Sequence, residues 1–478
     1  MKQTGIDAIA FYIPPIFLDI EQLAIHRSIE PAKLKQGLGL NKMALPDSNE
    51  DAASFAANAL LKLINDNHLD PRTIGRIYLG TESALDAAKP TATYALSAVE
   101  VILEERFGSR CFKHCDVLDM TFACVGAVDA LHNSIDWVNA GQGRNAVVIA
   151  SDFAKYELGS PGEYTQGAGA IAMLITEEPS IMYFSNTWGV ATEGVGDFHK
   201  PRRVHNKLDV LKQTAKILGT ELTEAAAKAL LESSTFGFWS DTNAQIELFK
   251  DEPVFDGQYS NKCYTNRIVG ALEHFRSQQT LEVLKDWQYM VFHLPYAYQA
   301  RRMIMGQWLN WLEEDGSINR LYEEVGEPGE DRKNWMKSVG KSNYYQSFLK
   351  EKIVYGERAS SEIGNMYTAS IFMSMLSVLN TAAEQQQEIA GHKMGFFSYG
   401  SGSKSKVFEG TINPGWRSMI NESKLFEELA QRVEINFTTY EQLHNNQLSK
   451  PIVAKSGIYL ENAGNIYPST GIRTYTML

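Results

Sequence analysis

The chain has 478 residues, with 45 Lys and Arg against 57 Asp and Glu, so its formal net charge is −12. This balance argues against a nucleic-acid binder, which needs a basic face, and no run approaches the ~18 consecutive apolar residues of a membrane span. The N-terminal segment lacks a signal-peptide cleavage site, and four cysteines are too few for a disulfide scaffold. We therefore expect a cytoplasmic enzyme that does not span a membrane.

Short apolar runs, each followed by a turn, alternate with amphipathic segments along most of the chain. The runs are 76–79, 145–150, 170–175 and 394–397, and the amphipathic segments are 51–66, 125–138 and 299–313. Strands that alternate with helices of this length predict βαβ units and a largely parallel sheet. Because such sheets bind ligands beyond the carboxyl ends of their strands, we expect functional residues in the turns.

Residues 208–250 break this alternation. The segments LDVLKQTAKILG and ELTEAAAKALLESS are rich in Ala, Leu, Lys and Glu and predict two helices with no strand between them. Gly219 suits the end of the first helix, and Thr220 or Thr223 suits the start of the second. We interpret the segment as a helical hairpin added to the body of the protein.

The sequence carries no fingerprint of a bound cofactor. It has no GxGxxG after a strand, no phosphate-binding P-loop and no HExxH. Cys111 and Cys115 flank His114, but a single CxxxC without a second pair is a weak metal signal, and structural cysteines are the simpler interpretation. We predict neither a metal nor a cofactor.

Cys124 stands immediately before a helical pattern. Apolar residues recur at Val125, Val128, Leu131 and Ile135, which is the spacing of one helix face. The thiol is therefore expected at a helix N-terminus, where unpaired amides and the helix dipole favour thiolate over thiol. The alternative is a buried core cysteine without a chemical role.

Two residues could serve such a nucleophile as acid or base. Glu82 lies in the turn after run 76–79, and His293 ends the apolar run 289–292. A Glu in a turn is usually solvated, and a His before Leu-Pro is usually a loop residue with satisfied hydrogen bonds. Together with Cys124, however, they form a set suited to acyl-thioester chemistry.

Eight blocks of the sequence resemble, in order and spacing, those of 3-hydroxy-3-methylglutaryl-CoA synthases. They are LGTESALD (79–86), TFACVGA (121–127), SDFAKYELG (151–159), TQGAGA (165–170), VFDGQYSNKCY (254–264), FHLPY (292–296), GNMYTAS (364–370) and FSYGSG (397–402). The resemblance extends over roughly residues 5–410. On these blocks the chain is identified as a member of that family, within the thiolase superfamily.

The resemblance implies an α/β thiolase-like fold, with two related halves in five α-β-α-β-α layers. The N-terminal half would span residues 1–185 and carry Glu82 and Cys124. The C-terminal half would span 186–478 and include the helical insertion at about 208–250. It would also carry three site residues, His293, Asn365 and Ser401. A homodimer is the expected assembly.

The resemblance also implies the role of each site residue. Cys124 would be the acylated nucleophile, Glu82 the general acid/base and His293 the group that polarises the acetoacetyl substrate. Backbone amides of Cys124 and Ser401 would form the oxyanion hole. The further substrate-binding residues implied are Tyr156, Thr165, Asn365, Ser401 and Arg302.

The implied reaction joins acetyl-CoA to acetoacetyl-CoA through an acetyl-Cys124 intermediate. Hydrolysis would then release 3-hydroxy-3-methylglutaryl-CoA and CoA, as in the mevalonate route to isoprenoids, so both acyl-CoAs are substrates and not cofactors. Basic segments 200–203 and 301–302 are expected near the CoA entrance, where local positive charge would offset the chain's net negative charge.

Two departures from the family pattern leave open whether the acceptor substrate is carried on CoA or on a carrier protein. The lysine usual five residues after the histidine is Tyr298 here, and 208–250 replaces a much shorter link. One alternative is therefore a β-branching synthase that uses acyl groups on a carrier protein in polyketide assembly. Two further alternatives are a cysteine hydrolase and a degenerate scaffold without activity.

Overall fold

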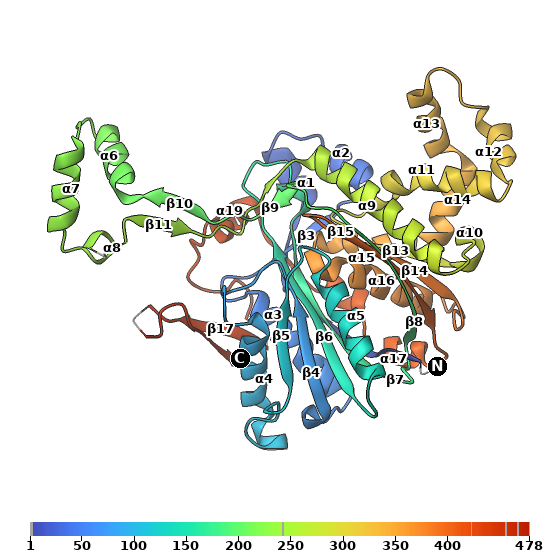
Figure 1. Ribbon diagram of the computed structural model, residues 1–478, viewed down its shortest axis with the longest axis horizontal. Helices are drawn as coiled ribbons and strands as arrows, with labels where there is room; N and C mark the ends of the chain where they lie inside the picture. The colour runs from blue at the N-terminus through green and yellow to red at the C-terminus, as the bar shows by residue number, and fades with distance from the viewer. Residues whose placement is uncertain (1–2, 241–242, 422, 455–456, 466–467, 478) are drawn as a thin grey trace. The chain divides into compact units, whose positions relative to one another are not determined.

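The computed structural model describes residues 3–240, 243–421, 423–454, 457–465 and 468–477 (Figure 1). The chain divides into two compact units. The larger unit comprises residues 1–197 and 257–478, and the smaller unit comprises residues 198–256.

A nine-stranded sheet in two parts forms the centre of the larger unit. The first part contains β1 (Thr4–Tyr12), β7 (Gly167–Glu177), β6 (Asn145–Ala154), β4 (Ile74–Gly80) and β5 (Asp116–Met120), in this order. The second contains β8 (Met182–Thr192), β15 (Lys404–Ile412), β14 (Lys393–Gly400) and β13 (Tyr289–Phe292). The two parts join where β1 pairs with β8, through Gly5↔Tyr183 and Ile6↔Met182.

The prediction of a largely parallel sheet is wrong. β4 pairs in parallel with β5 and β6, and β13 pairs in parallel with β14, whereas the other neighbouring strands described in this nine-stranded sheet are antiparallel. The reason lies in the connections. β14 leads to its neighbour β15 through a turn too short to hold the helix that a parallel crossover needs. β7 and β8 both run antiparallel to β1, which lies between them.

Alternate residues of each strand face opposite sides of the sheet and so separate the layers. In β6, Val147 and Ile149 pack with α3 (Ala52–Asp66) and α4 (Thr91–Phe107). Ala146 and Val148 contribute to a second core. That core also holds side chains of α5 (Gly126–Asn139) and α16 (Ser370–Glu384) and of the second sheet part.

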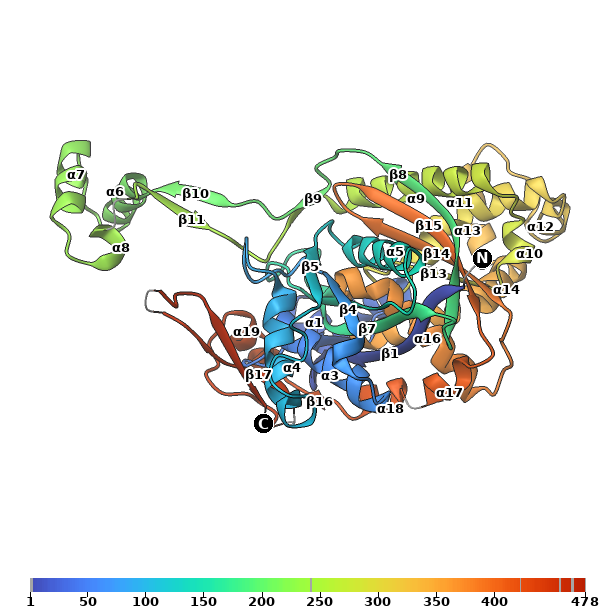
Figure 2. The same ribbon diagram turned by 60° about the horizontal axis from the view of Figure 1, so that its bottom comes forward.

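The second sheet part repeats this pattern. Met394 and Phe396 of β14 belong to the central core, whereas Phe397 and Tyr399 pack with α9 (Gly257–Gln278) and α11 (Gln299–Glu314). The helices and sheet parts therefore make five α-β-α-β-α layers, as the resemblance implied (Figure 2).

The three predicted amphipathic segments are helices close to their expected bounds. They are α3, α5 and α11. The start of α3 follows from its sequence, because Asp51 accepts hydrogen bonds from the amides of Ala53 and Ser54 while the Ser54 hydroxyl caps the Asp51 amide in return.

Shorter elements complete the larger unit. A three-stranded sheet is formed by β2 (Ile16–Asp19), β3 (Lys42–Leu45) and β16 (Val433–Glu434), and a hairpin by β17 (Ile458–Ala463) and β18 (Arg473–Met477). The remaining helices are α1 (Ile20–His26), α2 (Pro31–Leu38), α10 (Val283–Asp286), α12 (Ile318–Val325), α13 (Arg332–Lys341), α14 (Asn343–Lys352), α15 (Val354–Ile363), α17 (Trp416–Asn421), α18 (Leu425–Ala430) and α19 (Phe437–His444). Within the described ranges, no helix is both long enough and apolar enough to cross a bilayer.

The smaller unit contains the two helices that the sequence predicted, α6 (Lys207–Ile217) and α7 (Glu224–Ser233), together with α8 (Gly237–Ser240). Thr223 caps α7, as expected. Two strand pairs were not predicted: β9 (Phe198–His199) with β12 (Val254–Phe255), and β10 (Arg203–Asn206) with β11 (Gln245–Leu248).

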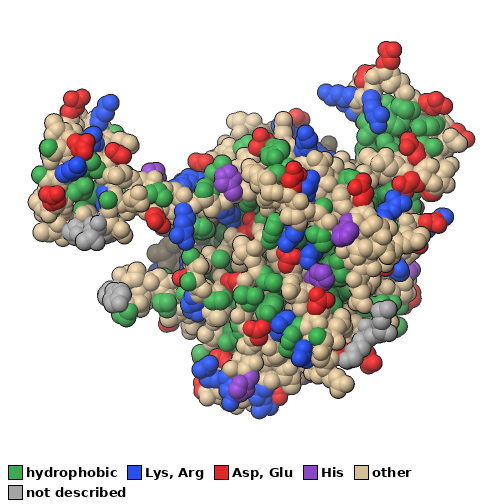
Figure 3. All heavy atoms as spheres, viewed as in Figure 1, with side chains coloured by type: hydrophobic (Ala, Val, Ile, Leu, Met, Phe, Trp, Pro, Cys, Tyr) green, Lys and Arg blue, Asp and Glu red, His purple; other side chains and the backbone are tan. Residues whose placement is uncertain are grey.

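Large apolar side chains lie exposed on the smaller unit, as Figure 3 shows. Ile217 is 85% exposed, Leu218 77% and Phe236 75%, whereas Ala215 and Ala227 are buried. A unit of this size has too little interior to cover its apolar residues.

Candidate active site

Cys124 and Glu82 meet at the carboxyl ends of two neighbouring strands. Cys124 lies between β5 and the first residue of α5, Gly126, and is 8% exposed. Glu82 follows β4, and its Oε1 lies 2.7 Å from the Cys124 Sγ, where it accepts the thiol hydrogen bond. The sequence-based prediction that this thiol stands at a helix N-terminus is therefore confirmed.

Two glycines allow the backbone around Cys124 to pack closely. A Cβ on Gly400, at the end of β14, would lie 2.7 Å from the Phe122 carbonyl oxygen. A Cβ on Gly80 would lie 2.2 Å from the Ala127 nitrogen. The ends of β4 and β14 can therefore approach the start of α5 only without side chains at these positions.

Asp152 fixes the turn that carries Glu82. It is fully buried and accepts hydrogen bonds from the Glu82 amide at 2.7 Å and from the Thr81 hydroxyl at 2.9 Å. It also accepts one from the Thr368 amide at 3.0 Å. One carboxylate thus joins the Glu82 turn to a segment more than 200 residues away. Sequence analysis did not single out Asp152, because its partner Thr368 is distant in the chain.

Tyr156 and Tyr367 lie close to the thiol and the carboxylate. Burial raises the pKa of Tyr156, and the nearby charges of Cys124 and Glu82 raise it further. Burial also raises the pKa of Tyr367, with added contributions from Tyr156, Glu82 and Cys124. The two rings lie 6.5 Å apart. Both phenols therefore remain protonated and able to donate a hydrogen bond at neutral pH.

Thr165 and Asn365 hold the segment that carries Tyr367. The Asn365 amide donates to the Thr165 carbonyl at 2.9 Å. The Asn365 Oδ1 accepts from the Tyr367 amide at 2.9 Å and from the Ser370 hydroxyl at 3.1 Å. Tyr367 itself has a left-handed backbone, with φ of 41°. These contacts identify Asn365 as a support of the Tyr367 turn.

His293 directly follows β13 and is 2% exposed. Its amide donates to the Phe397 carbonyl at 3.0 Å, and its carbonyl accepts from the Tyr264 hydroxyl. Burial lowers the pKa of His293 to about 3, although the Tyr367 backbone opposes this shift. The imidazole is therefore neutral at pH 7, with one N–H to donate.

Tyr264 connects the surroundings of His293 with those of Cys124. Its ring stacks on Tyr399, with 4.4 Å between the centroids, and lies 6.0 Å from the His293 ring. Burial raises the pKa of Tyr264, and Cys124 adds to the increase. The Tyr264 ring therefore lies within electrostatic range of the thiol.

Ser401 lies in the turn after β14, and Asp197 holds that turn. Asp197 is fully buried and accepts from the Tyr399 hydroxyl at 2.7 Å and from the Gly402 amide at 2.8 Å. The Ser260 hydroxyl donates to it at 3.1 Å. Sequence analysis did not single out Asp197, because its partners are distant in the chain.

Arg302 contacts α2 and the Tyr296 ring. Its Nη2 donates to the Gly37 carbonyl at 2.9 Å, and its guanidinium lies 5.6 Å from the centre of the Tyr296 ring. The neighbouring Arg301 instead pairs with buried Glu357, with Nε 2.7 Å from Oε1. Of these two arginines, Arg302 is therefore the one available to a ligand.

Tyr298, which stands where the family usually has lysine, packs against the end of α2. Its amide donates to the Leu38 carbonyl at 3.1 Å, and its ring lies against Gly39. The Arg301 guanidinium stacks on this ring, 3.8 Å from its centroid. In the smaller unit, Arg202 lies 3.7 Å from Glu247.

The two cysteines flanking His114 do not form a disulfide, and Cys111 is buried. Among the described residues, no group of three or more His, Cys, Asp and Glu could hold a metal ion.

Five α-β-α-β-α layers with a buried thiol at the start of a central helix are the arrangement of thiolase-like acyl-transferring enzymes. Comparison with known proteins narrows this class. Family models described as hydroxymethylglutaryl-coenzyme A synthase N terminal and C terminal match residues 1–180 and 235–457. The chain belongs to the hydroxymethylglutaryl-CoA synthase family and is an acyltransferase-type enzyme.

Individual relatives agree with this assignment. The chain is 29% identical to the hydroxymethylglutaryl-CoA synthase of Haloferax volcanii over 460 residues, which cover 93% of this chain and 92% of the relative. It is 26% identical to the enzyme of Enterococcus faecalis over 449 residues, covering 94% and 93% of the two chains.

Solved structures confirm the thiolase-like fold. The structure of MvaS in complex with 3-hydroxy-3-methylglutaryl coenzyme A matches with a TM-score of 0.77 and 26% identity, covering 100% of this chain and 99% of that one. The HMG synthase of the curacin biosynthetic pathway, solved with apo donor-ACP, matches with a TM-score of 0.72 and 19% identity, covering 100% of both chains. At that identity the second structure supports the fold alone.

Proposed function

We propose that this chain is a hydroxymethylglutaryl-CoA synthase, which condenses acetyl-CoA with acetoacetyl-CoA and hydrolyses the product from the enzyme. The observation that carries the proposal is the 2.7 Å contact between the Cys124 Sγ and the Glu82 Oε1 at the start of α5. The names of its relatives, and the 3-hydroxy-3-methylglutaryl coenzyme A bound to MvaS, support the choice of substrates.

In the first step, Cys124 is acetylated. The Cys124 sulfur attacks the thioester carbonyl of acetyl-CoA, and the CoA thiolate leaves and takes a proton. Amides of Cys124 and Ser401 would donate to the transient oxyanion. Donors of this kind each contribute roughly 3–4 kcal/mol in enzymes where they have been removed.

In the second step, a carbon–carbon bond forms. Glu82 takes a proton from the methyl group of acetyl-Cys124, and the resulting enolate attacks the ketone carbon of acetoacetyl-CoA. Neutral His293 would donate a hydrogen bond to the ketone oxygen, which becomes the hydroxyl group once protonated. Water then cleaves the Cys124 thioester, which makes the reaction irreversible and restores the thiol.

The surrounding residues fit supporting roles in this scheme. Tyr156, Thr165 and Asn365 would line or support the acyl pocket. Arg302 would contact CoA near its entrance, since its guanidinium is exposed and its neighbour Arg301 is engaged with Glu357. Both acyl-CoAs act as substrates, and the proposed chemistry needs no further cofactor.

The proposal extends to organisation and context. It includes two thiolase-like halves, residues 1–185 and 186–478, a homodimeric assembly and a cytoplasmic role in the mevalonate pathway. Membership of the hydroxymethylglutaryl-CoA synthase family supports these points.

A second candidate function is β-branching with acyl groups on a carrier protein. Tyr298 favours it, because the position where the family usually has a lysine for the cofactor is occupied by a ring packed against Gly39 and Arg301. The chemistry at Cys124 would be the same, and only the carrier of the acyl groups would differ.

Acetylation of Cys124 tests the proposed function directly. We expect acetyl-CoA alone to add one acetyl group to the protein, measured as intact mass, because the thiol reacts before the second substrate is needed. Cys124→Ala should show no adduct. An adduct that persists in this variant, for instance on Cys111 or Cys115, would contradict the assignment.

A further inference from the structure

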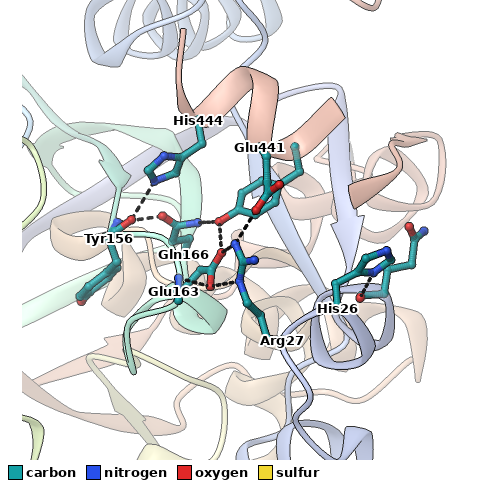
Figure 4. Close-up of polar contacts among 10 residues, drawn as sticks. His26, Arg27, Tyr156, Glu163, Gln166, Glu441 and His444 are labelled. Carbon is teal, nitrogen blue, oxygen red and sulfur yellow. Dashed lines mark hydrogen bonds and ion pairs between the residues drawn. The ribbon is translucent and has the colours of Figure 1, made fainter. Parts of the chain in front are cut away.

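Side chains hold the backbone of Tyr156 from both sides. Its amide donates to the Gln166 Oε1 at 2.7 Å, and its carbonyl accepts from the His444 Nε2 at 2.8 Å. Figure 4 shows both contacts, with the Tyr156 ring pointing away from them. His444 is the last residue of α19, and 288 positions separate it from Tyr156 in the chain.

Gln166 is itself oriented by a directed chain of hydrogen bonds. Its Nε2 donates to the Tyr440 hydroxyl oxygen at 2.8 Å, and that hydroxyl donates to the Glu163 Oε1 at 2.9 Å. Each group has one consistent role as donor or acceptor. The Gln166 amide therefore has one orientation, with its oxygen facing the Tyr156 amide.

An ion pair anchors the far end of this chain. Arg27 donates to both Glu163 carboxylate oxygens, from Nε at 2.8 Å and from Nη2 at 2.7 Å (Figure 4). The Gly159 amide donates to the same carboxylate at 2.8 Å. Glu163 is 2% exposed, so its charge is paired and hydrogen-bonded as a buried charge must be.

The intermediate residues are buried as deeply as the anchor. Gln166 is fully buried and Tyr440 is 1% exposed. Burial raises the pKa of Tyr440, and Glu163 adds to the increase, so the hydroxyl stays protonated and keeps donating. In such surroundings a polar group has no water to replace a lost partner.

We infer that Gln166 and Tyr440 are positioning residues for the reaction, through which α19 fixes the Tyr156 backbone and holds its ring beside Cys124 and Glu82. The inference rests on the proposed function, because it assumes that Tyr156 lines the acyl pocket. None of the eight sequence blocks reaches α19, so a segment outside the recognised motifs shapes the pocket.

Tyr440→Phe is the decisive variant, since it keeps the ring and removes the hydroxyl that Gln166 and Glu163 share. We expect kcat for condensation to fall about tenfold, because small displacements of aligned groups slow catalysis strongly. KM for acetyl-CoA should stay within about twofold, since no CoA contact is removed. Amide hydrogen exchange should accelerate in the peptide that contains Tyr156.

Glu441→Gln is the matched control. It is the next residue in α19, its side chain is 37% exposed, and it contacts the same Arg27 at 2.9 Å without joining the chain to Tyr156. This variant should keep the wild-type kcat and the wild-type exchange at Tyr156. If Tyr440→Phe does not fold, His444→Phe removes the other backbone contact and should give the same two changes.

The two readouts separate this inference from the proposed function. Unchanged exchange at Tyr156 in Tyr440→Phe, or faster exchange with unchanged kcat, would overturn the positioning role. Equal losses in Tyr440→Phe and Glu441→Gln would also overturn it. Retained condensation by Cys124→Ala would instead overturn the proposed function, while the exchange measurement would still report on the hydrogen-bond chain.

Discussion

At the residue scale, the contact between Cys124 and Glu82 makes a division of labour testable. We expect Glu82→Ala to retain acetylation of Cys124 but to lose condensation by at least about 100-fold, the lower end of the contribution of a general base. The reason is that the Glu82 carboxylate takes a proton from the methyl carbon, whereas the acetyl group is transferred from CoA to the Cys124 sulfur. Intact mass measures the first step, and consumption of acetoacetyl-CoA in the presence of acetyl-CoA measures the second.

Glu82→Gln serves as the control for the turn, since it keeps the side-chain length and leaves the contact between Asp152 and the residue 82 amide in place. Glu82→Gln should likewise retain acetylation of Cys124 and lose condensation. Loss of acetylation in both variants, as complete as in Cys124→Ala, would contradict the division of labour.

His293 predicts a pH dependence of stability. Its pKa is about 3 in the folded protein and about 6.5 when unfolded, so below pH 6.5 the unfolded chain binds the proton first. The contribution of His293 to the free energy of unfolding is fully present above pH 6.5 and is lost as the pH falls toward 3. Between pH 5 and pH 4 the loss amounts to about 1.4 kcal/mol per pH unit.

Urea unfolding at pH 7, 5 and 4 checks this expectation. His293→Asn should be less stable than wild type at pH 7, and the difference should shrink as the pH falls. Other groups titrate in both proteins, so the informative quantity is the difference between the two unfolding free energies. A difference that stays constant from pH 7 to pH 4 would show that His293 does not titrate as its burial implies.

The residues that sequence reasoning found differ in kind from those it missed. Cys124 was predictable because the helix that follows it has a regular apolar period, and Glu82 and His293 follow apolar runs. Asp152 and Asp197 support the candidate site through partners far away in the chain. Such partners become neighbours only after folding, so no local pattern in a single sequence indicates them.

At the scale of helices and strands, the structure shows which sequence patterns predict an element correctly. The helices α3, α5 and α11 follow from apolar periodicity and, in α3, from capping by Asp51. Strand direction does not follow in the same way. The apolar runs identify strands, but the short turn between β14 and β15 decides that this pair is antiparallel.

The smaller unit gives a prediction about folding. We expect replacement of residues 208–250 by a short Gly/Ser link to leave a folded protein with its main thermal transition within a few degrees of wild type. The reason is that β9 and β12 pair outside the deleted segment and the large cores contain none of its residues.

Differential scanning calorimetry and acetylation of Cys124 measure the outcome. A link of equal length but scrambled loop sequence controls for the junction itself. Complete loss of the folded state in both shortened chains would show that the segment is an integral part of the core.

At the scale of the whole molecule, the identity of the acceptor is decided by a direct comparison. We expect acetoacetyl-CoA to be condensed at least as fast as an acetoacetyl carrier protein at equal concentration. Exposed Arg302 can attract CoA phosphates despite the net charge of −12. Added salt should raise KM for CoA substrates, since exposed charges are screened over ~8–10 Å at physiological ionic strength.

At low ionic strength, Arg302→Gln should raise KM for CoA substrates, as added salt does for the wild type. Added salt should then raise the KM of this variant less than that of the wild type. Arg320→Gln, on α12, is a matched removal of one arginine at another place. Turnover of the carrier-bound substrate alone would replace the mevalonate interpretation by β-branching and leave the chemistry of Cys124 unchanged.

The contacts of Asp152 with Thr368, and of Gly400 with the Cys124 turn, have a consequence for biosynthesis. Chains emerge from the ribosome N-terminus first, and early segments begin to fold before synthesis ends. Strands β1, β4, β5, β6 and β7 can emerge with Cys124 and Glu82 already present, but the segments that secure both residues arrive more than 200 residues later. We therefore expect a nascent chain arrested before residue 368 to carry Cys124 without the geometry proposed for its acetylation, so that acetylation begins only after the later segments have emerged.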